Sequence, residues 1–122
     1  MPKKILVVDD DIHVLMMVEA RLKGNGFSVI AVSSGEAALQ MAREQKPDLI
    51  LLDVAMPPPN GYQVCQTLKS DPEYRTIPII MLTAKSSEND RFWGMEAGAD
   101  GYLTKPYDPL ELLNQIYRLL DA

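Results

Sequence analysis

The chain has 122 residues and a net charge of −5, with 47% hydrophobic and 24% charged residues. This composition is typical of a globular domain with one core, and we expect residues 1–122 to form a single domain. The acidic balance argues against direct binding of nucleic acid, which needs a surface that neutralises phosphates. No apolar run approaches the roughly 20 residues of a membrane-spanning helix. Because no long apolar leader precedes the first strand-like segment, we expect a cytoplasmic protein.

Strand and helix patterns alternate along the whole chain. Short apolar runs predict strands at 4–9, 27–32, 48–53, 77–83 and 101–104. Amphipathic spacing and stop signals predict helices from about 11 to 24, 35–45, 62–70, 87–97 and from 109 onward. Five strand–helix units with short loops imply parallel strands, right-handed crossovers and helices on both faces. We therefore expect a doubly wound α/β fold, a three-layer sandwich.

Several helix starts have side chains that can cap them. Asp11 precedes the first helix, and we interpret it as its cap rather than as a ligand. Ser33 and Glu36 have the spacing of a reciprocal capping pair before the second helix. Asp108-Pro109 combines an N-cap with proline at the first helical position. The predicted apolar stripe of the last helix is Leu113, Ile116, Tyr117 and Leu120.

Three other side-chain types have ordinary structural interpretations. Met16, Met17 and Met95 fall at helical spacings and indicate packing in a core or an interface. Cys65, the only cysteine, has no second cysteine for an internal disulfide, and we expect a small half-buried residue. His13, near the start of the first helix, is interpreted as a surface residue.

Polar residues gather where the predicted strands end. In an open parallel sheet the ligand site lies beyond the carboxyl ends of the strands. Any one of these residues alone would be explained as a cap or a solvated charge, but their coincidence at strand ends indicates a site. They are Asp9, Asp10 and Asp11 after the first strand, Asp53 after the third, Thr83 after the fourth and Lys105 after the fifth.

The chemistry of this set favours magnesium and a phosphoryl group. Carboxylates held together repel one another unless a cation compensates. Oxygen ligands without His or Cys suit Mg²⁺. Lys105 adds a second positive charge, and Thr83 adds a donor, so an anion with its own oxygens is expected. No glycine-rich phosphate loop follows the first strand, so a nucleotide cradle is not predicted.

Five segments, in order and with family spacing, resemble the receiver domain of bacterial response regulators, the phosphorylated partners in two-component signalling. They are Val7-Val8-Asp9-Asp10-Asp11, Leu52-Asp53-Val54-Ala55-Met56-Pro57 with Gly61, Leu82-Thr83-Ala84, Gly98-Ala99-Asp100-Gly101-Tyr102 and Thr104-Lys105-Pro106. The resemblance covers essentially the whole chain. It implies a flavodoxin-like, five-stranded parallel sheet of order 2-1-3-4-5 with helices on both faces.

The resemblance also implies roles for individual residues: an acceptor, magnesium ligands and groups that hold the phosphoryl oxygens. Asp53 is the acceptor. The magnesium ligands are Asp9 or its water, Asp10, Asp53 and the Ala55 carbonyl. The phosphoryl oxygens are held by Lys105, Thr83 and the Ala84 backbone N–H. Tyr102 is the aromatic residue that turns inward when Thr83 moves toward the phosphate. The peptide bond between Lys105 and Pro106 is expected to be cis.

The implied function is a switch without turnover of a released metabolite. A histidine kinase or histidine phosphotransfer protein supplies the phosphoryl group, and water later removes it from Asp53. The signal leaves through the predicted helix 87–97, the strand 101–104 and the last helix, toward an output protein or a C-terminal effector domain. We predict that Trp93 lies exposed on this surface and supports output or self-association; the alternative is that its ring folds back over the edge of the sheet.

Some positions depart from the family pattern. Asn60 stands where the family often has Asp, which bears on the choice of partner. Ala55 and Lys85 provide no amide or carboxylate to orient an attacking water, so we predict a long-lived phosphorylated state.

Parts of the sequence also fit three other functions. The first is a magnesium-dependent aspartyl-phosphate phosphohydrolase, indicated by Asp9-Asp10-Asp11, although the chain lacks room for a substrate-selecting cap. A flavin-binding module would need a hydroxyl-rich phosphate loop after the first strand. A degenerate receiver that serves only as a docking surface is disfavoured by the intact Asp53, Thr83 and Lys105.

Overall fold

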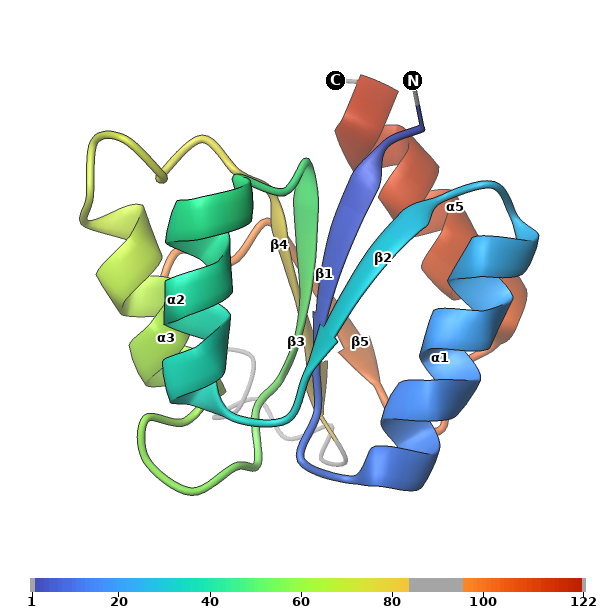
Figure 1. Ribbon diagram of the computed structural model, residues 1–122, viewed down its shortest axis with the longest axis horizontal. Coiled ribbons are helices and arrows are strands. Elements are labelled where there is room, and N and C mark those ends of the chain that lie inside the picture. Colours follow the sequence, from blue (N-terminus) through green and yellow to red (C-terminus); the bar gives the residue numbers. More distant parts are fainter. Residues whose placement is uncertain (1, 84–95, 122) are drawn as a thin grey trace.

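The computed structural model describes residues 2–83 and 96–121, in which a parallel sheet lies between two helical layers (Figure 1). The strands are β1 (Lys4–Val8), β2 (Ser28–Val32), β3 (Leu49–Asp53), β4 (Ile79–Thr83) and β5 (Gly101–Thr104). The helices of these ranges are α1 (Ile12–Gly24), α2 (Gly35–Gln45), α3 (Gly61–Lys69) and α5 (Pro109–Asp121). The sheet order β2-β1-β3-β4-β5 confirms the predicted fold. Within these ranges no helix is long and apolar enough to cross a membrane.

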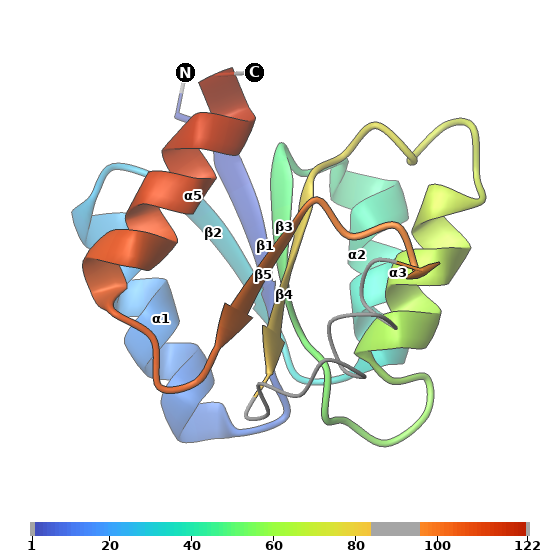
Figure 2. The same ribbon diagram turned by 180° about the vertical axis from the view of Figure 1, so that it is seen from behind.

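Alternate residues of the central strands face opposite helical layers. On β1, Leu6 and Val8 join the core that includes α2 and α3, whereas Ile5 and Val7 join the core that includes α1 and α5. Figures 1 and 2 show α2 and α3 on one side of the sheet and α1 and α5 on the other. Strands buried on both faces need continuous apolar sequence, which is why the apolar runs predicted them correctly.

The structure confirms two of the predicted helix caps. The carboxylate of Asp11 accepts the backbone N–H groups of His13 and Val14 at 3.0 and 3.3 Å. Asp108 accepts the backbone N–H of Leu110 at 2.9 Å, at the start of α5. Both carboxylates satisfy donors that the first helical turn leaves unpaired.

The start of α2 differs from the prediction, and the start of α3 holds a cap that the sequence analysis missed. Ser34, not Ser33, caps α2, because the helix begins at the following residue and only the Ser34 hydroxyl reaches its third backbone N–H, at 3.1 Å. At α3, the Asn60 side chain and the Gln63 side chain bond each other's backbone N–H groups at 3.0 and 2.8 Å. Asn60, which departs from the family pattern, is therefore the N-cap of α3.

Exposure corrects the expected role of three apolar side chains. Met16 and Met17 on α1 are 62% and 57% exposed, so these side chains do not pack in the core. Of the two predicted roles, core packing is excluded and interface packing is left. Tyr117 is 44% exposed and was wrongly assigned to the packed stripe of α5, whose fully buried residues are Leu112 and Ile116. Because Leu112 and Ile116 are four residues apart on one helical line, Tyr117 lies about 100° away from that line.

Cys65 is wholly buried rather than half-buried. Its thiol donates to the carbonyl oxygen of Ala97 at 3.4 Å, and burial raises its pKa to about 11. The thiol therefore stays protonated at neutral pH and is not a nucleophile. The predicted helix 87–97 falls mainly on residues 84–95, outside the described residues, as do Trp93 and Met95.

Candidate functional site

Three carboxylates converge at the carboxyl edge of the sheet. Asp9 follows β1 directly, Asp53 is the last residue of the neighbouring β3, and Asp10 begins the loop to α1. One carboxylate oxygen from each lies within 4.8 Å of those of the other two. Asp9 and Asp53 are buried, whereas Asp10 is exposed. The structure therefore brings together the carboxylates that strand-end positions predicted, with the exception of Asp11, which caps α1.

Lys105 reaches this cluster from the loop after β5. Its ammonium nitrogen lies 3.0 Å from an oxygen of Asp9 and 3.2 Å from an oxygen of Asp53. The Lys105 backbone N–H donates to the carbonyl of Thr83, and the bond to Pro106 is cis, as expected. The second Asp9 oxygen accepts the backbone N–H of Asp11 at 2.9 Å. A backbone hydrogen bond to the end of β4 thus fixes the backbone of Lys105, and the Asp11 N–H fixes the carboxylate of Asp9.

The electrostatics show an excess of negative charge. Burial, with the nearby charge of Asp9, raises the pKa of Asp53, and Lys105 offsets only part of this. For Lys105, burial alone would lower the pKa, but the hydrogen bond to Asp9 and the charge of Asp53 outweigh it and raise the pKa. Within residues 2–83 and 96–121, one ammonium therefore does not balance the three carboxylates, and a further cation would stabilise their ionised forms.

The donor set fits a magnesium ion. Two oxygens that share one Mg²⁺ at about 2.1 Å lie at most about 4.2 Å apart. The oxygens of Asp9, Asp10 and Asp53 lie within 4.8 Å of one another, so small side-chain rotations would bring them to that spacing, and a carboxylate that stays farther away would bind the ion through a water. Ala55, whose carbonyl is a further predicted ligand, is an exposed residue two positions past Asp53, in the loop between β3 and α3.

Gly61 fixes the backbone behind Asp53. A Cβ at this position would lie 2.4 Å from the Asp53 carbonyl oxygen and 2.8 Å from Cα of Val54. The Gly61 N–H also donates to the Val54 carbonyl at 3.2 Å. Only glycine allows the start of α3 to pack this closely on the end of β3. The motif contains Gly61, but the role of this glycine could not be predicted from sequence, because the contact exists only when the loop is folded.

The remaining predicted residues lie on β4 and β5. Thr83 is buried at the end of β4, and Tyr102 on β5 is partly buried against the core on the α2–α3 side. In the register of the two strands Thr83 is paired with Thr104. Ala84, the predicted backbone donor, and Lys85 lie outside the described residues.

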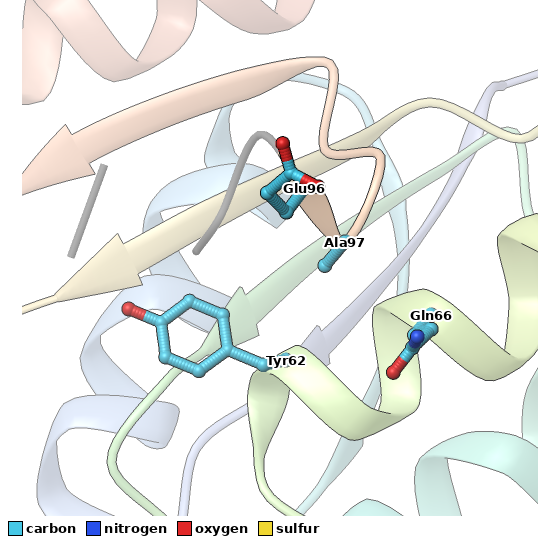
Figure 3. Close-up of a pocket in the computed structure, with 4 residues that line it drawn as sticks. All are labelled: Tyr62, Gln66, Glu96 and Ala97. Atoms are coloured by element: carbon cyan, nitrogen blue, oxygen red, sulfur yellow. The ribbon is translucent and has the colours of Figure 1, made fainter. Parts of the chain in front are cut away.

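A separate hollow of about 170 Å³ lies between α3 and the segment before β5 (Figure 3). Tyr62 and Gln66 line it from α3, and Glu96 and Ala97 line it from the other side. None of its lining residues belongs to the acidic cluster. The cluster of carboxylates with Lys105 therefore remains the candidate for chemistry.

Comparison with known proteins identifies the family of this site. Residues 5–117 match the family model of the response regulator receiver domain. The chain belongs to this family. It is 44% identical over 120 residues to the alkaline phosphatase synthesis transcriptional regulatory protein PhoP of Bacillus subtilis, covering 98% of this chain and 49% of PhoP. The chain thus spans about half the length of the curated relatives it matches.

Solved structures show the same receiver architecture. A putative response regulator from Chloroflexus aurantiacus has a TM-score of 0.95 and 39% identity, with 100% of both chains covered. The receiver domain of a sensor histidine kinase from Pseudomonas aeruginosa has a TM-score of 0.92 and 32% identity, also over 100% of both chains. That receiver domain is described with a magnesium ion coordinated in its active-site cleft.

Proposed function

We propose that this receiver domain is a phosphoryl-accepting switch and that Asp53 is the acceptor. The observation that carries the proposal is a buried carboxylate at the end of a central strand, 3.2 Å from the Lys105 ammonium and beside two further carboxylates. Burial and neighbouring charge raise the pKa of Asp53, which makes its ionised form more basic than an ordinary carboxylate. A group with these properties is suited to attack phosphorus.

The proposed reaction is an in-line displacement. One Asp53 oxygen forms a bond to the phosphorus of a phosphohistidine or of a small acyl phosphate. The P–N or P–O bond to the donor breaks, and its electron pair leaves with the donor. The Lys105 ammonium, the Thr83 hydroxyl and the Ala84 N–H stabilise the oxygens of the transferred group. Water later attacks the same phosphorus, which releases phosphate and restores the Asp53 carboxylate.

Asp9, Asp10, Asp53 and the Ala55 carbonyl would hold Mg²⁺. When bound, the ion neutralises charge on the phosphoryl oxygens and on the carboxylates. The proposal is supported by the all-oxygen donor set and its spacing within 4.8 Å. It is also supported by the magnesium described for the related receiver of Pseudomonas aeruginosa.

The partners are proposed from the family. A histidine kinase or histidine phosphotransfer protein would supply the phosphoryl group. Thr83 and Tyr102 would couple the phosphorylated site to β5, α5 and the segment 87–97, from which an output protein or a C-terminal effector domain reads the state. Relatives such as PhoP are described as transcriptional regulators. Self-association through a surface with Trp93, and a cytoplasmic location, remain predictions.

The test of this function is phosphorylation by a small acyl phosphate with Mg²⁺, followed by intact mass. We expect a single phosphoryl adduct on the wild type, no adduct on Asp53→Asn and no adduct when Mg²⁺ is removed with EDTA. The control is Asp48→Asn, which removes a carboxylate at the opposite end of β3 and should leave phosphorylation intact. A full adduct on Asp53→Asn would contradict the proposed acceptor.

The lifetime of the phosphorylated state is the second proposal. Ala55 and Lys85 lack a group that orients water, so Ala55→Asn and Lys85→Glu should each accelerate loss of the acyl phosphate by roughly tenfold. The measurement is the decay of the phosphorylated mass after the donor is removed. Equal decay in the wild type and in the double variant would show that these side chains do not set the lifetime.

A further inference from the structure

β4 and β5 end in a pair of threonines. Thr83 and Thr104 are partners in the parallel register, and the backbone N–H of Lys105 bonds the Thr83 carbonyl beside them. Partners in this register present their side chains on the same face of the sheet. Tyr102 precedes Thr104 by two residues and therefore shares that face. Thr104 thus lies next to both residues of the proposed switch, although neither the motifs nor the proposed function gives it a role.

The hydroxyl oxygen of Thr104 is buried and has no hydrogen-bond partner within residues 2–83 and 96–121. A hydroxyl that loses water without gaining a partner raises the free energy of the state that contains it. Valine has nearly the same shape and would occupy the position without this cost. A buried hydroxyl that costs stability, where valine would not, is typical of a functional position.

We infer that Thr104 is a positioning residue of the switch, an inference that rests on the proposed function. Among the residues that the structure describes its hydroxyl has no partner, and it gains one when Thr83 and Tyr102 rearrange around the phosphorylated site. The unpaired hydroxyl therefore destabilises the resting arrangement relative to the rearranged one. Only the molecules that already have the competent arrangement react with the phosphoryl donor. A bias toward that arrangement therefore increases the rate of phosphorylation.

The experiment compares Thr104→Val, which removes the hydroxyl, with Thr104→Ser, which keeps it and removes the methyl group. Each variant is phosphorylated by an acyl phosphate with Mg²⁺, and the rate constant is followed by intact mass. The midpoint of urea unfolding is measured without Mg²⁺ and without the donor. A hydrogen bond worth about 1 kcal/mol changes the ratio of the two arrangements, and with it the rate of phosphorylation, by a factor of about five.

We expect Thr104→Val to be phosphorylated about fivefold more slowly than the wild type and yet to unfold at higher urea. Thr104→Ser should keep the wild-type rate and unfold at lower urea. A residue with a purely structural role would not change rate and stability in opposite directions.

The outcomes separate this inference from the proposed function. Absence of an adduct on the wild type would overturn the proposed function, and this inference with it. Adducts that form at equal rates on the wild type and on Thr104→Val would overturn the role of Thr104 alone and leave Asp53 as the acceptor. Unfolding of Thr104→Val at lower urea than the wild type would also overturn it, because the hydroxyl would then have a partner in the resting state.

Discussion

Two lysines bind aspartates at opposite edges of the sheet, and their surroundings differ. At the amino-terminal edge, the Lys69 ammonium lies 2.7 Å from an Asp100 oxygen and donates to the carbonyls of Arg75 and Ile77 at 3.0 and 2.8 Å. The same Asp100 oxygen accepts the backbone N–H of Ile79 at 2.9 Å. Every donor of the ammonium has an acceptor, and one carboxylate faces one cation.

At the carboxyl edge, Lys105 is shared between Asp9 and Asp53, and Asp10 adds a third carboxylate to the same cluster. Burial and the charge of Asp9 raise the pKa of Asp53 despite the ammonium. Among the described residues, three carboxylates therefore face one ammonium. A balanced ion pair such as Lys69–Asp100 ties segments together, whereas the unbalanced group around Lys105 leaves charge that a ligand can neutralise.

Substitution of Lys105 should give the largest effect. Lys105→Met removes the charge that faces the phosphoryl oxygens, and we expect phosphorylation by acyl phosphate to slow by about 100-fold. The matched control is Lys69→Met, which removes the ammonium at the other edge and should leave the rate unchanged. If both variants were phosphorylated at the wild-type rate, the functional contrast between the two lysines would be lost.

The reverse contrast is expected in stability. Lys69→Met leaves Asp100 without its cation and two backbone carbonyls without a donor, which should cost about 2 kcal/mol in the free energy of unfolding. Urea denaturation measures this change. Lys23→Met, which breaks an exposed ion pair with Glu19 on α1, is the control and should leave the midpoint unchanged. A loss no larger than that of Lys23→Met would contradict the structural role of Lys69.

The smallest expected effect is a pH dependence of stability at Asp53. Its pKa is raised in the folded protein, so the native state binds a proton more tightly than the unfolded chain, and ionisation of Asp53 costs stability at neutral pH. Asp53→Asn should therefore be more stable than the wild type at neutral pH in the absence of Mg²⁺. This advantage should shrink as the pH falls through the raised pKa of Asp53. An advantage that stays constant with pH would show that charge is not its cause.

Local sequence features predicted much of the architecture. The apolar runs at β3 and β4 predicted strands buried on both faces, because such strands need no polar side. Asp11 and Asp108 predicted helix starts, because a cap acts on backbone groups only two or three residues away. The convergence of Asp9 and Asp53 was also predictable, because adjacent parallel strands end at the same edge.

Other features depend on neighbours that are distant in the sequence. The exposure of Met16 and Met17 follows from which face of α1 meets the sheet, and hydrophobic character alone does not specify that face. The close approach of Gly61 to the Asp53 carbonyl requires α3 to fold back on β3. The burial of Cys65 requires the contact of its thiol with Ala97, which lies in a different segment.

The order of elements, the parallel sheet and the set of residues at its carboxyl edge were predictable from local sequence, because they follow from periodicity, short loops and the chirality of crossovers. The balance of charge at each lysine, and the lack of a partner for the Thr104 hydroxyl among the described residues, arise only in the folded chain. Lys105 meets Asp9 across 96 residues of sequence, and Lys69 meets Asp100 across 31. Electrostatic energies and hydrogen-bond satisfaction depend on distances of a few ångströms between such segments, and only the folded chain sets those distances.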